Sequence, residues 1–187
     1  GVAPTSSVFS VGTENAVNIN GEDYIMYAFH SIAGYSKLNT YTGNGSATAG
    51  PIVNTGFEPA YVMIKRTDGQ DDWIVVDKFR SPSNSRYNYL MPNSNAEENG
   101  SASGTINPLV NFLTNGFQIA ATWGAVNGNG STYIYMAFAS DPSATPVLGD
   151  SFYNKLYTGT GSPQSINGLG FSPSLVWLKS RNQVNKN

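Results

Sequence analysis

Residues 125–138 read AVNGNGSTYIYMAF, and residues 16–29 read AVNINGEDYIMYAF. The two stretches align without a gap at an offset of 125 − 16 = 109 residues. In each, an Asn- and Gly-rich run is followed by β-branched and aromatic residues of the kind that strands prefer. A sequence that contains this pattern twice predicts a protein built from a repeated β unit.

Two further pairs of segments extend the repeat. Residues 41–45 (YTGNG) match 157–161 (YTGTG) at an offset of 116, and residues 56–65 (GFEPAYVMIK) match 170–179 (GFSPSLVWLK) at an offset of 114. The period is therefore about 115 residues, which is the size of a domain rather than of a solenoid repeat of about 20–50 residues.

This period predicts three regions. Residues 1–31 are the C-terminal strands of a preceding repeat, residues 32–140 are one complete β-sandwich repeat, and residues 141–187 are a linker and the N-terminal strands of a following repeat. Both end segments carry apolar strands whose edges would be open if each stood alone. Two arrangements stay open: pieces of a longer tandem array, or two end segments that pair with each other as a second module.

Short β-branched and aromatic runs bounded by Gly and Asn predict strands at 61–65, 73–77, 117–120 and 133–138. The run Asn127-Gly128-Asn129-Gly130 predicts a hairpin turn before the last of them, because Asn-Gly supports the positive φ angles that match strand twist. The same place in the first copy reads Asn18-Ile19-Asn20-Gly21.

One short helix is predicted near 108–114. Asn107 would cap it, Pro108 would take its first position, and Asn115-Gly116 would end it. Its core-facing residues would be Leu109, Val110, Phe112 and Leu113. The remaining sequence predicts an all-β fold, an antiparallel β-sandwich of the jelly-roll or lectin-like kind.

Composition excludes several classes of chemistry. The 187 residues include no Cys and one His, so neither a disulfide framework nor a multi-histidine metal site can be built. Lys+Arg is 10 and Asp+Glu is 12, and this balance argues against nucleic-acid binding through a basic face. No apolar run approaches the ~18–20 residues of a membrane span, so we expect none. The sequence offers no catalytic constellation.

Two candidate binding sites follow from the residues. Asp68, Asp71 and Asp72 form the densest carboxylate cluster, and hard cations such as calcium want several oxygens. The alternative is a solvated turn, since the twelve-residue EF-hand spacing is missing. Lys65, Arg66, Lys78, Arg80 and Arg86 accompany these acids, and we expect ion pairing rather than binding of an anionic glycan.

Aromatic residues supply the second candidate site. Trp123 and Trp73 could stack on sugar rings while Asn127 and Asn129 bond the hydroxyls. The alternative is that these aromatics pack in the core. Trp123 is the better candidate because it lies beside a Gly-rich turn.

The segments GFEPAYVMIK (56–65) and YIYMAF (133–138), with the motifs of 73–80, 90–93 and 112–117, resemble a repeated domain of tailed-bacteriophage structural proteins, marine phages above all. Proteins that carry it are described as tail-fibre, virion structural or lectin-like (concanavalin A-like) proteins. The resemblance covers nearly the whole chain. It implies a virion-associated module and no particular reaction, because neither segment carries chemistry.

The sequence therefore predicts a non-enzymatic virion structural protein, such as a capsid decoration, spike or tail-fibre module, located on the virion or otherwise outside cells. It would mediate assembly contacts and contribute to attachment to the host surface. The expected partners are other copies of the chain, other virion proteins and host-surface glycans, with no cofactor. The alternative is a carbohydrate-binding, lectin-like module of a secreted bacterial protein.

Overall fold

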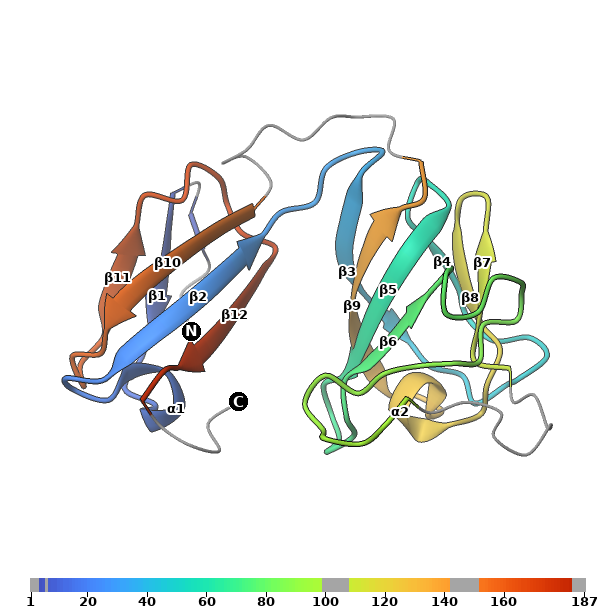
Figure 1. Ribbon diagram of the computed structural model, residues 1–187, viewed down its shortest axis with the longest axis horizontal. Coiled ribbons are helices and arrows are strands. Elements are labelled where there is room, and N and C mark those ends of the chain that lie inside the picture. The colour runs from blue at the N-terminus through green and yellow to red at the C-terminus, as the bar shows by residue number, and fades with distance from the viewer. Residues whose placement is uncertain (1–3, 6, 99–107, 142–151, 183–187) are drawn as a thin grey trace. The chain divides into compact units, whose positions relative to one another are not determined.

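The computed structural model describes all residues except 1–3, 6, 99–107, 142–151 and 183–187 (Figure 1). The chain forms two compact units. Unit 1 combines Gly1–Ser31 with Pro146–Asn187, and unit 2 is Ile32–Thr145.

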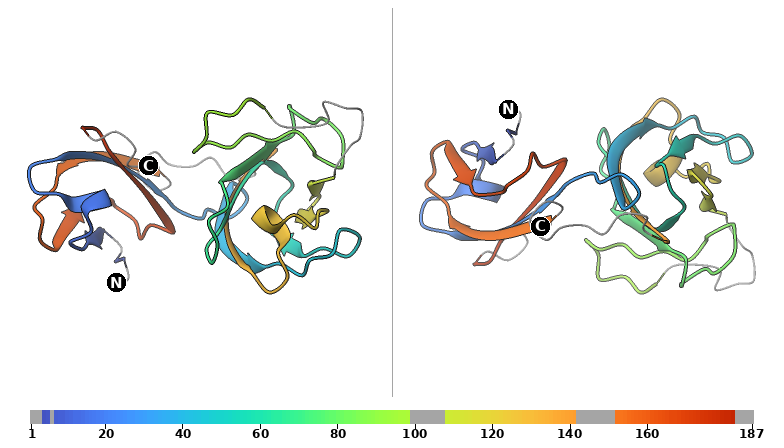
Figure 2. Two further views of the ribbon diagram at one scale, coloured as in Figure 1. Left: turned by 90° about the horizontal axis from the view of Figure 1, so that it is seen from below. Right: turned by 90° about the horizontal axis from the view of Figure 1, so that it is seen from above.

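Unit 2 is a two-layer antiparallel sandwich. One layer is a four-stranded sheet in the order β3 (Ser36–Thr42), β9 (Thr132–Ala139), β5 (Pro59–Arg66), β6 (Ile74–Asp77). The other layer has the order β4 (Ile52–Asn54), β8 (Gly116–Ile119), β7 (Val110–Leu113). A one-turn helix, α2 (Gly124–Asn127), leads into β9 at one end of the sandwich (Figures 1 and 2).

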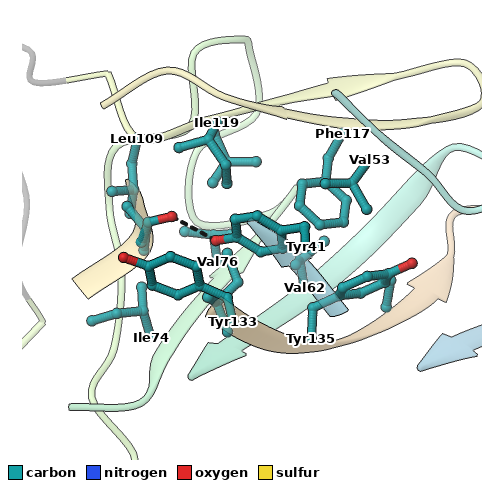
Figure 3. Packing of buried hydrophobic residues seen from close by; sticks show 14 of the residues in the cluster. Tyr41, Val53, Val62, Ile74, Val76, Leu109, Phe117, Ile119, Tyr133 and Tyr135 are labelled. Carbon is teal, nitrogen blue, oxygen red and sulfur yellow. Dashed lines mark hydrogen bonds between the residues drawn. The ribbon is translucent and has the colours of Figure 1, made fainter. Parts of the chain in front are cut away.

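The core of unit 2 fills the space between its two sheets. Alternate residues of each strand point inward, as the two-residue period of a strand requires. Tyr133, Tyr135 and Ala137 do so on β9. The ring of Tyr135 contacts that of Phe117 of the second sheet, with centroids 5.2 Å apart (Figure 3). Aliphatic side chains of β5 and β6 complete this layer, among them Val62, Ile64, Ile74 and Val76.

Unit 1 is a smaller sandwich made from both ends of the chain. Its larger sheet has the order β10 (Phe152–Thr158), β2 (Asp23–Phe29), β12 (Leu175–Ser180). Its second layer pairs β1 (Val8–Val11) with β11 (Gln164–Asn167), and the one-turn helix α1 (Asn15–Asn18) leads into β2. The two end segments therefore share both sheets and one core, built from Phe9, Val11, Met26, Ala28, Ile166, Leu169 and Phe171.

The predicted all-β antiparallel sandwich is confirmed, but the predicted helix near 108–114 is wrong. Val110–Leu113 is strand β7, which pairs with β8 through a tight turn. Val110 and Phe112 point into the core, with 0% and 4% of their surface exposed. A short segment with three apolar residues in four fits either structure, and pairing with β8 satisfies its backbone in a way that two isolated helical turns would not. The expected cap, Asn107, lies outside the described residues.

The predicted hairpin at 127–130 is also wrong. The residues before the turn are the one-turn helix α2, closed by a bond from the Asn127 N–H to the Trp123 carbonyl (2.7 Å). Gly130, with φ of +75°, then reverses the chain into β9. The first copy does the same, with α1 and Gly21 at φ of +81° before β2. The Asn-Gly signal marked the reversal correctly, although the element before it is helical.

Candidate functional site

Each unit contains a buried polar network formed by residues that occur in both copies of the sequence repeat. In unit 2 the Asn127 side chain is fully buried. Its Nδ2 donates to the carbonyls of Ala121 (2.7 Å) and Ser46 (2.9 Å), while its Oδ1 accepts from the Asn44 N–H (2.9 Å). One amide thus fastens the end of α2 to the glycine-rich turn after β3.

Unit 1 repeats this arrangement with Asn18. The Asn18 Nδ2 donates to the carbonyls of Gly12 and Ser162, both at 2.6 Å, and its Oδ1 accepts from the Thr160 N–H (2.8 Å). Asn127 and Asn18 occupy the same position of the sequence repeat. The side-chain amide of Asn127 is hydrogen-bonded within the fold, so it is not available to bind a sugar hydroxyl.

A stacked pair of tyrosines lies beside each of these amides. In unit 2 the rings of Tyr41 and Tyr133 stack with centroids 4.9 Å apart and an interplanar angle of 13° (Figure 3). The Tyr41 hydroxyl donates to the Val126 carbonyl at 2.6 Å, the dashed line of Figure 3, and the Tyr133 hydroxyl donates to the Gly124 carbonyl at 2.5 Å. Burial raises the pKa of Tyr41 well above its ordinary value.

The tyrosine pair of unit 1 is equivalent. The rings of Tyr24 and Tyr157 stack at 5.1 Å and 16°, and the Tyr157 hydroxyl donates to the Val17 carbonyl at 2.6 Å. Burial likewise raises the pKa of Tyr157. The tyrosines of the repeat therefore fasten the one-turn helix to the sheet in both units.

Unit 2 has an exposed aromatic cluster around Trp123. Trp123 has 39% of its surface exposed, and its ring lies 5.3 Å from that of Tyr89 at 44°. At the offset of the repeat, Trp123 corresponds to Glu14. The guanidinium of Arg66 lies beside Gly124, with its Nη1 3.7 Å from the position that a Cβ there would take. We call Trp123, Tyr89 and Arg66 the aromatic face of unit 2.

Arg66 also gathers two of the three carboxylates predicted as a calcium site. Its Nε bonds Asp68 at 2.8 Å and its Nη1 bonds Asp71 at 3.2 Å. The hydrogen bond from Arg66 holds the pKa of Asp68 below its usual value. Asp72 instead accepts from the Asn93 amide at 2.7 Å. The carboxylates thus face a guanidinium and an amide, which disfavours a shared cation in this arrangement.

No three His, Asp or Glu side chains converge on a metal position within the described part of the chain. Among the other predicted residues, Trp73 donates its backbone N–H to Asn93 at 2.9 Å, and Asn129 lies exposed in the turn before β9. Of the residues predicted to bind a sugar, Trp123 is therefore exposed, whereas Asn127 is buried.

The model of one protein family matches residues 1–142 and 148–187 of this chain, and its description is Domain of unknown function (DUF7483). The chain belongs to the DUF7483 family. No curated protein and no solved structure matches it. In this DUF7483 chain, no described helix has the length and apolar character needed to cross a membrane.

The predicted ion pairing holds for only one of the other basic residues of this set, among the described residues of the DUF7483 chain. Lys65 donates to the carbonyls of Arg66 (2.9 Å) and Asp71 (2.7 Å), and Lys78 donates to the Ser140 hydroxyl. Arg80 bonds Asp77 at 3.1 Å and also pairs with Glu98. For Arg86 the expected ion pairing is wrong: the ion pairs of the described residues do not include it, and it is 6% exposed, with its guanidinium 4.9 Å from the ring centroid of Phe112. Burial lowers its pKa. Its placement depends on strand β7, so the incorrect helix prediction concealed it.

Tyr89, a member of the aromatic face, is not predicted from the sequence. Tyr89 follows no motif, and it reaches Trp123 because Leu90 pairs with Val75 of β6 in an isolated bridge. A contact between residues 34 positions apart (123 − 89 = 34) depends on that tertiary pairing. The sequence indicates Tyr89 in one way: this residue lies in a segment that is present in one of the two copies of the repeat.

Proposed function

We propose that this chain is a non-enzymatic structural module of a tailed-bacteriophage virion, where it mediates assembly contacts and contributes to host attachment. One observation carries the proposal: the same network of Asn, Tyr and Gly residues is built twice, and in both units it serves the fold. A β module that can be repeated along a chain without cysteines suits a particle exposed outside cells. The resemblance to phage structural domains supports the same role.

The test is the composition of the particle. Virions purified from the source host on a density gradient should contain this chain at a fixed stoichiometry, as measured by quantitative mass spectrometry. A wash in high salt should leave that stoichiometry unchanged. If the chain is abundant in the lysate but absent from purified particles, the proposal is wrong.

A second candidate function rests on the aromatic face. Trp123 presents an exposed ring, and Tyr89 and Arg66 beside it supply a second ring and a set of donors. Flat apolar rings next to hydrogen-bonding groups are the usual recognition surface for sugars. The aromatic face would therefore bind a glycan, either on a host surface or as the lectin-like module of a secreted bacterial protein.

The glycan role is tested with a matched pair of variants. On a glycan array, Trp123→Ala should abolish the binding that the unaltered chain shows, with the far-ultraviolet circular dichroism unchanged. Phe79→Ala is the control, because Phe79 is also an exposed aromatic of unit 2, at 83% exposure. Equal loss in both variants, or retained binding in Trp123→Ala, would remove the aromatic face from consideration.

A further inference from the structure

Arg86 of unit 2 is a buried cation for which the described residues supply no ion pair. Its Nη1 donates to the Ser81 carbonyl, whereas its Nε is buried and has no hydrogen-bond partner within the described part of the chain. Removing a charge from water costs free energy that pairing and hydrogen bonding normally offset. The guanidinium therefore has a donor that the described fold leaves unused.

The backbone around Arg86 is fixed by hydrogen bonds that do not involve its charge. The Arg86 N–H donates to the Val110 carbonyl of β7 at 2.7 Å, and the Arg86 carbonyl accepts from the Leu109 N–H at 3.0 Å. Two residues earlier, the Asn84 Nδ2 donates to the Phe112 carbonyl (2.6 Å) and its Oδ1 accepts from the Phe112 N–H (2.8 Å). The guanidinium is thus carried on a preorganised segment, which lowers the cost of ordering it around a ligand.

The side chains near this guanidinium stabilise its charge without supplying an acceptor for Nε. The Phe112 ring, 4.9 Å away, attracts a cation but has no oxygen. The Asp77 Oδ2 accepts from Arg80 at 3.1 Å, and Glu58 is exposed. Burial lowers the pKa of Arg86, whereas the charges of Glu58 and Asp77 act to raise it. An arginine keeps its charge at neutral pH, so the acceptor that suits this donor is an anion.

We propose that Arg86 binds a small, planar, singly charged oxyanion of the carboxylate type, which accepts the Nε–H. A guanidinium edge and a carboxylate match in geometry and form two parallel hydrogen bonds. The small size follows from the 6% exposure of Arg86, which leaves little surface for a larger ligand. The single charge follows from Glu58 and Asp77, because their negative charges oppose a dianion. The inference does not depend on the assembly role or on the glycan role.

The experiment uses the full chain with sodium formate as the probe. The NMR correlation signal of the Arg86 Nε–H reports binding directly, and its disappearance in Arg86→Lys assigns it. A formate titration at an ionic strength held constant with sodium chloride should shift this signal along a saturating curve. The Nε signals of Arg66 and Arg80 should stay in place, because these guanidiniums already bond carboxylates.

Stability supplies a second measurement with a matched pair of variants. At a formate concentration ten times its Kd, the folding equilibrium constant of unit 2 should rise about 11-fold in urea denaturation. Arg86→Met removes the donor and keeps an unbranched side chain, so its stability should not respond to formate. Arg80→Met is the control. Arg80 has its own carboxylate partners, so this variant should retain the 11-fold response.

Four results would overturn the proposal. The first is the absence of a saturable shift at formate concentrations on the order of 0.1 M. The second is an equal shift of the Arg80 signal, which would be a general salt effect. The third is an Arg86 signal that moves in Glu58→Gln without formate, because Glu58 would then be the acceptor. The fourth is a signal that moves with chain concentration alone, because a second copy would then supply the acceptor. If Arg86→Met does not fold, the titration of the unaltered chain decides.

Discussion

Replacing Asn127 with Ala is the sharpest test of the idea that the repeated residues hold the fold. The substitution removes three hydrogen bonds, which join the side chain to Ala121, Ser46 and Asn44. Ala121 is buried, so its carbonyl loses its partner away from water and costs about 1–3 kcal/mol. The groups on Ser46 and Asn44 can reach water, so each lost bond costs about 1 kcal/mol. The expected loss of stability in unit 2 is therefore about 4 kcal/mol.

The equivalent substitution in unit 1 should cost less. The partners of Asn18 belong to Gly12, Ser162 and Thr160, which are exposed, and to Gln164, which is half-buried. Water can replace the lost bonds there, so Asn18→Ala should destabilise unit 1 by about 2 kcal/mol. Asn129→Ala is the matched control two positions from Asn127. Asn129 lies at an exposed site, so its change should be within about 0.5 kcal/mol.

Urea denaturation followed by tryptophan fluorescence measures these differences. Trp177 is the sole tryptophan of unit 1, and Trp73 and Trp123 belong to unit 2, so a Trp177→Phe background isolates the signal of unit 2. With an m-value of about 1–2 kcal/mol per molar, Asn127→Ala should lower the midpoint by at least about 2 M. A loss below about 1 kcal/mol, or one equal to that of Asn129→Ala, would refute the structural role of this amide.

Three further predictions concern other positions. Gly43→Ala should destabilise unit 2 by about 1–3 kcal/mol in the same denaturation assay, because its Cβ would overlap a backbone carbonyl, whereas Gly12→Ala has open space and should be close to neutral. Burial raises the pKa of Tyr61 and of Tyr135 from 10.0 to about 12. The folded state therefore binds protons more tightly, and stability should be constant below pH 10 and fall as the pH rises toward 12, which thermal melts over that range would check. Phe79→Ser should change the melting temperature of unit 2 by less than about 2 °C, since Phe79 is 83% exposed.

The sequence predicts most strands of this fold because their chemistry is local. Strands β5, β6, β8 and β9 coincide with runs of β-branched and aromatic residues, within a residue or two at each end. The segment Val110–Leu113 is different, because three apolar residues in four, flanked by Pro and Gly, satisfy the signals of a helix and of a strand equally. The pairing with β8 decides between them, and pairing is a long-range property.

The residues of the candidate site also divide into those that local sequence predicts and those that depend on long-range contacts. The repeat marked Asn127 as important, and Asn is a common residue both in buried turns and in sugar sites. Only the burial of Asn127 and its three bonds distinguish the two roles. Trp123 was predictable as an exposed aromatic beside a Gly-rich turn, whereas its neighbour Tyr89 was not, because a separate strand pairing brings them together.

The two units of this chain act as a control for each other. A side chain with equivalent contacts in both, such as Asn127 and Asn18, is accounted for by the fold that the units share. A feature found in one unit needs another explanation, and the aromatic face of unit 2 is such a feature. The aromatic face exists because unit 2 has the segment that carries Tyr89 and has Trp123 where unit 1 has Glu14.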